Sequence, residues 1–252
     1  MRIAYKLAYV GTNFHGFQYQ PNVRTVVGEI YKALKSIGID YKRTKLRCAG
    51  RTDAGVHAFG QVIAINLEKP IFPRVFNAHL PEDVTFWAWC EVENDFNPRK
   101  AKSRTYMYVM PAEGYDISAM RKASKLLLGT HDFSNFTKKF GERRCIRTIY
   151  NVELRLDGDF IVFEIVGNAF TWNMVRCIAS ALSEVGSGYR SVEWFRDLLN
   201  PEKYRERVEP APAYGLILKD VEYEDVEFEV DEYAWKTLMQ RIKEIVRFHG
   251  TI

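Results

Sequence analysis

The first indication of the fold class comes from residues 148–166, which read TIYNVELRLDGDFIVFEIV. Two apolar runs, Thr148–Leu156 and Phe160–Val166, flank the pair Asp157-Gly158. An Asp-Gly pair between two strand-forming runs is a strong signal for a tight β-hairpin. The sequence therefore predicts two antiparallel strands in this part of the chain.

Strands and helices are expected on both sides of this hairpin. The further predicted strands are Arg2–Tyr9, Lys45–Cys48, Gln61–Leu67, Val84–Val92, Arg104–Met110 and Gly215–Tyr223. The predicted helices are the one that Thr25 caps, Ile117–Leu128, Phe170–Val185 and Glu232–Phe248. Because they do not alternate regularly as βαβ units, the pattern favours an α+β fold with a mostly antiparallel sheet flanked by helices.

Both halves of the chain contain strands followed by a helix, which indicates two similar subdomains. A length of 252 residues suits one large or two modest domains. We place the division after residue 104, so that residues 1–104 form an N-terminal α/β subdomain and residues 105–252 a C-terminal one.

The composition indicates a globular protein. Hydrophobic residues make up 47% and charged residues 27% of the chain, which argues against disorder. No apolar run approaches the ~18 residues of a membrane span, and the alternating N-terminus does not resemble a secretory signal. The four cysteines lie far apart without a CxxC pair, so a reducing, cytoplasmic setting is expected.

Positive charge is concentrated in the first part of the chain. Residues 1–150 hold 24 basic and 13 acidic side chains, whereas residues 151–252 hold 12 and 19. Such asymmetry indicates a basic face that binds a polyanion, although an uneven solvated surface is the alternative. The clustered cations are Lys42, Arg43, Lys45 and Arg47, and later Lys138, Lys139, Arg143, Arg144 and Arg147.

Asp220–Glu232 carries eight carboxylates in thirteen residues. A metal site or partner patch is one interpretation. We favour an exposed edge segment, because like charges at a sheet edge deter strand pairing.

The candidate catalytic group lies in residues 47–58, RCAGRTDAGVHA. Gly50 and Gly55 flank Asp53 and permit a tight loop that a ligand can approach. A carboxylate held there beside Arg51 is a candidate nucleophile, and an Asx-turn is the alternative. For His57 we expect a structural hydrogen bond, because no serine or cysteine nucleophile motif and no metal-ligand spacing accompany it.

The segment GRTDAGVHA, residues 50–58, resembles a motif of the TruA family of tRNA pseudouridine synthases. Four further segments resemble family motifs in the same order, so that the likeness spans roughly residues 3 to 224. They are YVGTNFHGFQ (9–18), RTYMY (104–108), NAF with MVR (168–170 and 174–176) and AYGLIL (213–218). Val10 and Phe17 depart from the commonest family residues, outside the catalytic motif.

The resemblance implies isomerisation of uridine to pseudouridine in the anticodon stem-loop of tRNA, at nucleotides 38, 39 and 40, without a cofactor. Asp53 would supply transient covalent catalysis. Attack at C6 of uracil, attack at C1′ of ribose and removal of the C2′ proton all remain open. The resemblance also implies a homodimer that grips tRNA across both subunits.

The same resemblance implies roles for four other residues. Tyr106 would stack on the extruded uracil, Leu216 would close its other face, and Arg176 would pair with Asp53. Arg51 would enter the space that the flipped nucleotide vacates or contact phosphate. The alternatives are a core tyrosine, a core leucine and an exposed arginine off the apolar stripe of its helix.

Two other functions are alternatives to this interpretation. A non-catalytic tRNA-binding or RNA-folding module on the same scaffold would have no evident need for Asp53, Tyr106 and Arg176 together. A glycosidase-type hydrolase usually needs a second, acid carboxylate, and the motif contains none.

Overall fold

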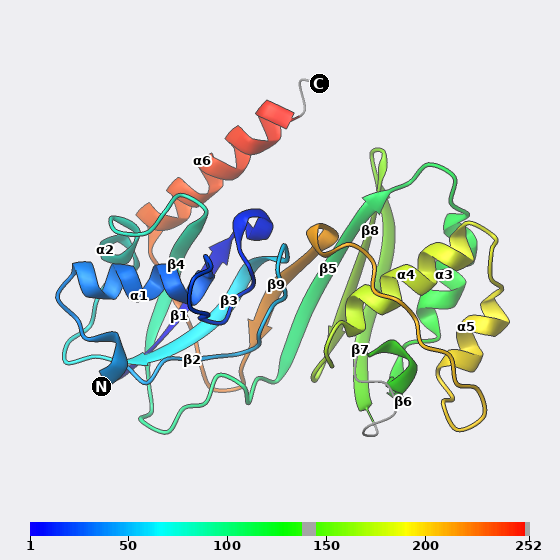
Figure 1. Cartoon of the computed structure of the whole chain (residues 1–252), viewed down its shortest axis with the longest axis horizontal. Helices are drawn as coiled ribbons and strands as arrows, with labels where there is room; N and C mark the ends of the chain where they lie inside the picture. Colours follow the sequence, from blue (N-terminus) through cyan, green and yellow to red (C-terminus); the bar gives the residue numbers. More distant parts are fainter. Residues whose placement is uncertain (138–144, 250–252) are drawn as a thin grey trace. The chain divides into compact units, whose positions relative to one another are not determined.

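The computed structural model describes residues 1–137 and 145–249 of the chain. The chain forms two compact units, the first made of Met1–Ala101 with Val221–Ile252 and the second of Lys102–Asp220 (Figure 1). The sequence-based division after residue 104 assigned residues 221–252 to the C-terminal subdomain, whereas in the structure this segment joins the first unit.

The sheet of the first unit is built around β1 (Arg2–Tyr9). It pairs antiparallel with β3 (His57–Asn66) on one side and β4 (Val84–Val92) on the other. Two short strands extend this sheet: β2 (Arg47–Cys48) on β3 and β10 (Glu229–Val230) on β4. Both residues of β10 are exposed at the end of the strand order, so this part of the acidic segment has the expected edge position. The rest departs from the prediction, because Asp220, Val221 and Glu222 belong to the longer strand Leu216–Glu222 and Asp231 is buried.

The helices of the first unit are α1 (Val26–Ser36), α2 (Pro73–Asn77) and α6 (Glu232–His249), with short 3-10 turns η1 (Gly11–Asn13) and η2 (Tyr41–Arg43). Helices α2 and α6 pack against strand β4 on opposite faces. Phe86 of β4 stacks on Phe76 of α2 at 4.9 Å between ring centroids. Its neighbour Trp87 meets Trp235 of α6 at 5.2 Å. Because consecutive strand residues point to opposite faces, α6 completes the burial of this strand and so belongs to the first unit.

The second unit contains the hairpin that the sequence predicts. Its strands are β5 (Ser103–Pro111), β6 (Gly129–Asp132), β7 (Ile146–Asp157), β8 (Phe160–Gly167) and β9 (Leu216–Glu222), in the order β9-β5-β8-β7-β6. Strands β7 and β8 pair antiparallel with Asp157 opposite Phe160. The loop is therefore Gly158-Asp159, one residue later than the sequence suggested.

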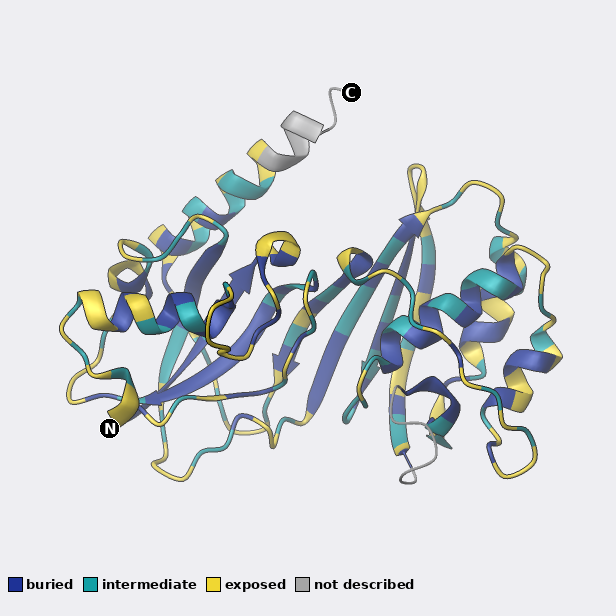
Figure 2. Cartoon of the chain, viewed as in Figure 1, coloured by how far each residue is buried: buried dark blue, intermediate teal, exposed yellow. Residues whose placement is uncertain are grey.

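The helices of the second unit are α3 (Ile117–Lys125), α4 (Met174–Gly186) and α5 (Val192–Leu198), with 3-10 turns η3 (Ser134–Phe136) and η4 (Ala213–Gly215). Helix α4 begins four residues after the predicted start at Phe170, because Asn173 has a left-handed φ of 64°. The apolar stripe expected for this helix is buried within α4, where it consists of Met174, Cys177, Ile178, Ala181, Leu182 and Val185, whereas Phe170 lies before the helix and is half-buried. Figure 2 shows buried residues of each unit in dark blue.

The two units together confirm the predicted α+β fold with a mostly antiparallel sheet. Within the described ranges, no helix combines the length and the apolar character that crossing a bilayer requires.

Candidate functional site

The Asp53 loop (residues 49–56) connects β2 to β3 in the first unit, and Asp53 is half-buried within it. The segment after β1 holds this loop through its backbone. The Phe17 N–H donates to the Thr52 carbonyl at 3.1 Å, and the Gly55 N–H donates to the Phe14 carbonyl at 3.4 Å. These bonds fix the backbone on both sides of Asp53, which limits the positions that its carboxylate can reach.

Two side chains add buried contacts to the same loop. The Tyr9 hydroxyl lies 2.7 Å from the Thr52 hydroxyl, and the pair is buried. The side-chain amide of Gln61, which is fully buried, donates to the Gly50 carbonyl at 2.9 Å. Burial removes the competition from water, so the Tyr9–Thr52 bond restrains the loop more firmly than an exposed one would.

Two glycines make this packing possible. A Cβ at Gly11 would lie 2.0 Å from the Val56 carbonyl oxygen, far inside van der Waals contact. Gly55 has a φ of 80°, which residues with a side chain rarely adopt. The close approach at Gly11 and the turn at Gly55 place the two segments directly against each other.

His57 has the structural role that the sequence analysis expects. Its Nδ1 accepts a hydrogen bond from the Gly11 N–H at 3.1 Å. Since Nδ1 is the acceptor, the ring proton of the neutral imidazole is on Nε2. His57 therefore ties the loop after β1 to the start of β3.

One more potential nucleophile, Cys48, lies at the end of β2, directly before the Asp53 loop. Burial raises the pKa of this thiol, and the nearby charges of Arg99 and Arg51 only partly oppose that effect. A thiol with a raised pKa stays protonated at neutral pH and is a weak nucleophile. Asp53 therefore remains the candidate of this loop, and Arg51 is exposed beside it.

The remaining predicted residues belong to the second unit. Tyr106 lies near the middle of β5 and is half-buried. Its ring meets the ring of Phe170 at 5.0 Å with an interplanar angle of 77°, an edge contact that restrains the tyrosine ring. The sequence analysis placed Phe170 at the start of a predicted helix. Its position in the sequence does not indicate that its ring contacts Tyr106.

Arg176 lies in the first turn of α4 and is half-buried rather than exposed. Its Nε donates to the Ala211 carbonyl at 2.6 Å, and the Ala211 N–H donates to the Arg176 carbonyl at 3.1 Å. A helix N-terminus carries partial positive charge, so a guanidinium is unfavourable there unless an anion balances it. The first turn of α4 contains no acidic residue. This placement suits an arginine that serves an anionic group from elsewhere.

The segment 211–216 connects the residues of this unit. Ala211 is bonded to Arg176, and the carbonyl of Pro212 accepts from the Tyr108 hydroxyl of β5 at 3.0 Å. Burial is the main cause that raises the pKa of Tyr108, to about 12, so its phenol remains a donor at neutral pH. Leu216 follows as the first residue of β9 and is 7% exposed. The segment thus holds Leu216 beside the strand that carries Tyr106.

The five predicted residues are therefore divided between the units. Asp53 and Arg51 lie in the first, and Tyr106, Arg176 and Leu216 lie in the second. In the basic clusters, Lys42, Arg43, Lys45 and Arg47 are exposed in and after η2. Arg147 is partly buried, and Lys138, Lys139, Arg143 and Arg144 lie outside the described residues.

The sequence of this chain resembles those of known proteins. The family model described as tRNA pseudouridine synthase matches residues 7–99 and 123–224. The first block includes Asp53 and the second includes Arg176 and Leu216, while Tyr106 lies between the two. Among solved structures, one described as a "Cbf5-Nop10-Gar1 Complex" has a TM-score of 0.38 at 14% identity, over 72% of this chain and 45% of that one.

Three curated relatives match over almost the whole chain, and each is named tRNA pseudouridine synthase A. The relative from Archaeoglobus fulgidus is 64% identical and covers 100% of this chain and 95% of its own. The relative from Methanosarcina mazei is 50% identical over 98% and 95%, and that from Pyrococcus furiosus is 43% identical over 100% and 95%. The chain therefore belongs to the TruA family of tRNA pseudouridine synthases.

Proposed function

We propose that this enzyme isomerises uridine to pseudouridine in the anticodon stem-loop of tRNA, with Asp53 as the nucleophile and without a cofactor. The observation that carries the proposal is the loop around Asp53, which is fixed by backbone bonds from Phe17 and to Phe14 and by the buried Tyr9–Thr52 contact. A carboxylate on a fixed loop is ready to meet a substrate without reorganising.

The reaction balances without any added reagent. The C1′–N1 bond breaks, the uracil turns, and a C1′–C5 bond forms. The proton that C5 loses is matched by a proton that N1 gains, so substrate and product are isomers. Asp53 forms and then releases a covalent bond at C6 or C1′, or instead carries the C2′ proton away and back.

The other residues receive roles that suit their positions. Tyr106, restrained by Phe170, stacks on the extruded uracil, and Leu216 contacts the other face. Arg176, half-buried at the positive end of α4, pairs with the Asp53 carboxylate and keeps it ionised. Arg51, exposed on the Asp53 loop, contacts phosphate or takes the place of the flipped nucleotide.

The basic cluster of Lys42, Arg43, Lys45 and Arg47 supports tRNA binding through phosphates, which positions the RNA without reading its sequence. We extend the proposal to nucleotides 38, 39 and 40, to a cytoplasmic enzyme and to a homodimer that grips one tRNA across both subunits. Mass-spectrometric mapping of a treated tRNA tests the positions, and sedimentation of the purified protein tests the dimer.

The central experiment follows tritium release from tRNA that carries uridine tritiated at C5. The wild-type protein should release tritium, and Asp53→Asn should release none while it binds tRNA with nearly unchanged affinity. Asp95→Asn, at an exposed carboxylate of the same unit, is the matched control and should be fully active. Binding of tRNA without any release by the wild type would instead support a non-catalytic RNA module.

A further inference from the structure

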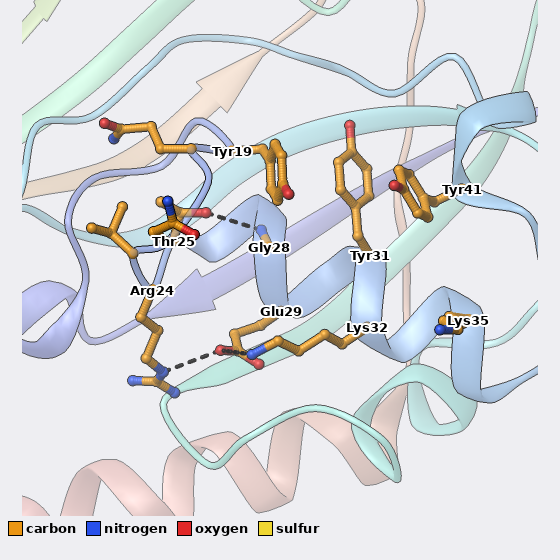
Figure 3. A pocket seen from close by; sticks show the side chains of 12 residues that line it. Tyr19, Arg24, Thr25, Gly28, Glu29, Tyr31, Lys32, Lys35 and Tyr41 are labelled. Atoms are coloured by element: carbon orange, nitrogen blue, oxygen red, sulfur yellow. Dashed lines mark hydrogen bonds and ion pairs between the residues drawn. The ribbon is translucent and has the colours of Figure 1, made fainter.

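An open groove of about 570 Å³ lies beside helix α1, and none of the residues to which we assign catalysis lines it (Figure 3). The segment before α1, α1 itself and η2 form its walls. The residues that give it chemical character are Tyr19, Tyr31, Tyr41, Lys32, Lys35 and Arg24. Neither Asp53 nor Arg51 lines it.

Three tyrosine rings form a row along one side of this groove (Figure 3). Tyr31 stacks on Tyr41 with 4.3 Å between the centroids and 24° between the planes. Tyr19 follows at 5.6 Å from Tyr31, tilted by 49°, and is 49% exposed. The row therefore ends in an accessible ring, which is the arrangement on which a nucleobase can stack.

The charge of the groove is positive on balance. The carboxylate of Glu29 accepts hydrogen bonds from Arg24 at 3.2 Å and from Lys32 at 3.0 Å. Arg24 also forms a bidentate ion pair with Asp83. These four charges cancel. Lys35 remains on the groove wall, and Lys42 and Arg43 follow Tyr41, while the carboxylate of Asp40, which caps η2, offsets one of these charges.

The residue Tyr19 at the edge of the groove lies only two residues from a backbone contact with the Asp53 loop. Phe17, whose N–H bonds to the Thr52 carbonyl, is two residues before Tyr19. An extended chain spans at most ~3.6 Å per residue, so the Cα atoms of Phe17 and Tyr19 are within about 7 Å. One RNA strand that delivers a uridine to Asp53 can therefore reach the edge of the groove with a nearby nucleotide.

We infer that this groove binds an unpaired nucleotide of the substrate RNA, with its base stacked on Tyr19 and its phosphates near Lys35 and η2. Aromatic faces next to exposed cations are the combination that binds single-stranded RNA, and stacking tolerates any base. The inference rests on the proposed function in one respect, that the substrate is RNA.

The test uses the full-length protein and tRNA. Tyr19→Ala should weaken tRNA binding and raise KM about tenfold, with kcat unchanged, because the lost stacking acts on binding and not on the reacting bond. Tyr19→Phe retains the ring and should behave as wild type. Tyr233→Ala, at a tyrosine of α6 that is 69% exposed, is the matched control for loss of a surface ring.

A second measurement addresses the charge. Lys35→Ala should lower the salt dependence of tRNA binding by the equivalent of about one phosphate contact, and Lys35→Arg should restore it. A short oligoribonucleotide containing 2-aminopurine should lose fluorescence on binding to the wild type and lose less with Tyr19→Ala. Thermal melting checks that all variants fold.

Unchanged Kd and KM for Tyr19→Ala would overturn the inference and would leave the groove to a protein partner or to no ligand. Failure of the proposed function looks different. In that case the wild type releases no tritium, whereas RNA binding still depends on Tyr19 and Lys35.

Discussion

The buried hydroxyl of Tyr9 lies 2.7 Å from the hydroxyl of Thr52, the residue directly before Asp53. Strand β1 and the Asp53 loop are thus joined by a side-chain hydrogen bond between residues 43 positions apart. The contact links the centre of the first sheet to the carboxylate that we propose as nucleophile, and it can be removed by deleting a single oxygen.

Tyr9→Phe should therefore lower kcat about tenfold, because a loosened loop presents the carboxylate less often in the reactive position. The free energy of unfolding should fall by about 1 kcal/mol. Tyr5→Phe is the matched control: Tyr5 is also buried on β1, and its hydroxyl donates to the Ile71 carbonyl at 2.8 Å, away from the loop. It should lose similar stability but retain kcat, as measured by urea unfolding and tritium release. Equal kcat values for both variants would show that the Tyr9 bond has no part in catalysis.

Arg176→Lys should retain the charge but lose the planar donor that holds Ala211 at 2.6 Å. We expect kcat/KM to fall by about 10- to 100-fold, since the compact ammonium lacks the rigid planar fork with which a guanidinium bonds the carbonyl through Nε and presents its terminal nitrogens to a carboxylate. Arg121→Lys provides the comparison, because the Arg121 Nε of α3 likewise donates to a carbonyl, that of Leu154 in β7, at 2.9 Å. Full activity in Arg176→Lys would remove the guanidinium from the proposed site.

Gly11→Ala should be strongly destabilising, because the new Cβ would meet the Val56 carbonyl oxygen at 2.0 Å and one backbone segment must move. A cost of several kcal/mol is expected from overpacking of this severity. Gly50→Ala is the matched change in the same part of the unit, since nothing lies within 4 Å of its Cβ position. Thermal melting should show a large loss of Tm for the first variant and almost none for the second. Similar Tm values would mean that the two loops are not in contact in solution.

The stability should also fall at high pH. Burial is the main cause that raises the pKa of Cys177 to about 12 and that of Cys90 to about 11, from an ordinary value of 9.0. Above pH 9 the unfolded chain loses these protons while the folded chain retains them, so unfolding becomes more favourable as the pH rises toward 12. Urea midpoints at pH 8 and pH 10.5 measure the loss. Cys177→Ala should reduce the difference between the two midpoints, and an undiminished difference would assign the pH dependence to other groups.

Much of the fold was predictable because its signals are local. The apolar runs in Val84–Val92 and in the hairpin reflect residues that face a core, and the strands occur as expected. The side chain of Thr25 accepts a hydrogen bond from the Gly28 N–H and caps α1 as predicted. Helix boundaries that depend on one unusual backbone angle were harder to predict, as the left-handed φ of Asn173 directly before α4 shows.

The contacts that shape the candidate site were harder to predict. The Asp53 motif was visible in the sequence because it is long and carries two glycines. The partners of that loop were not, because Tyr9 looks like any strand tyrosine until Thr52 lies opposite it. Phe170 and Ala211 likewise gain their roles from pairings across their unit, and such pairings leave no periodic trace in the sequence.

The return of residues 221–252 to the first unit affects the order in which the chain can fold. During synthesis, Lys102–Asp220 is complete before α6 emerges. The second unit can therefore begin to fold while the first unit still lacks residues 221–252. Until then Trp87 lacks Trp235 and Leu238, the side chains that cover it. A nascent chain at this stage would present an apolar patch around Trp87.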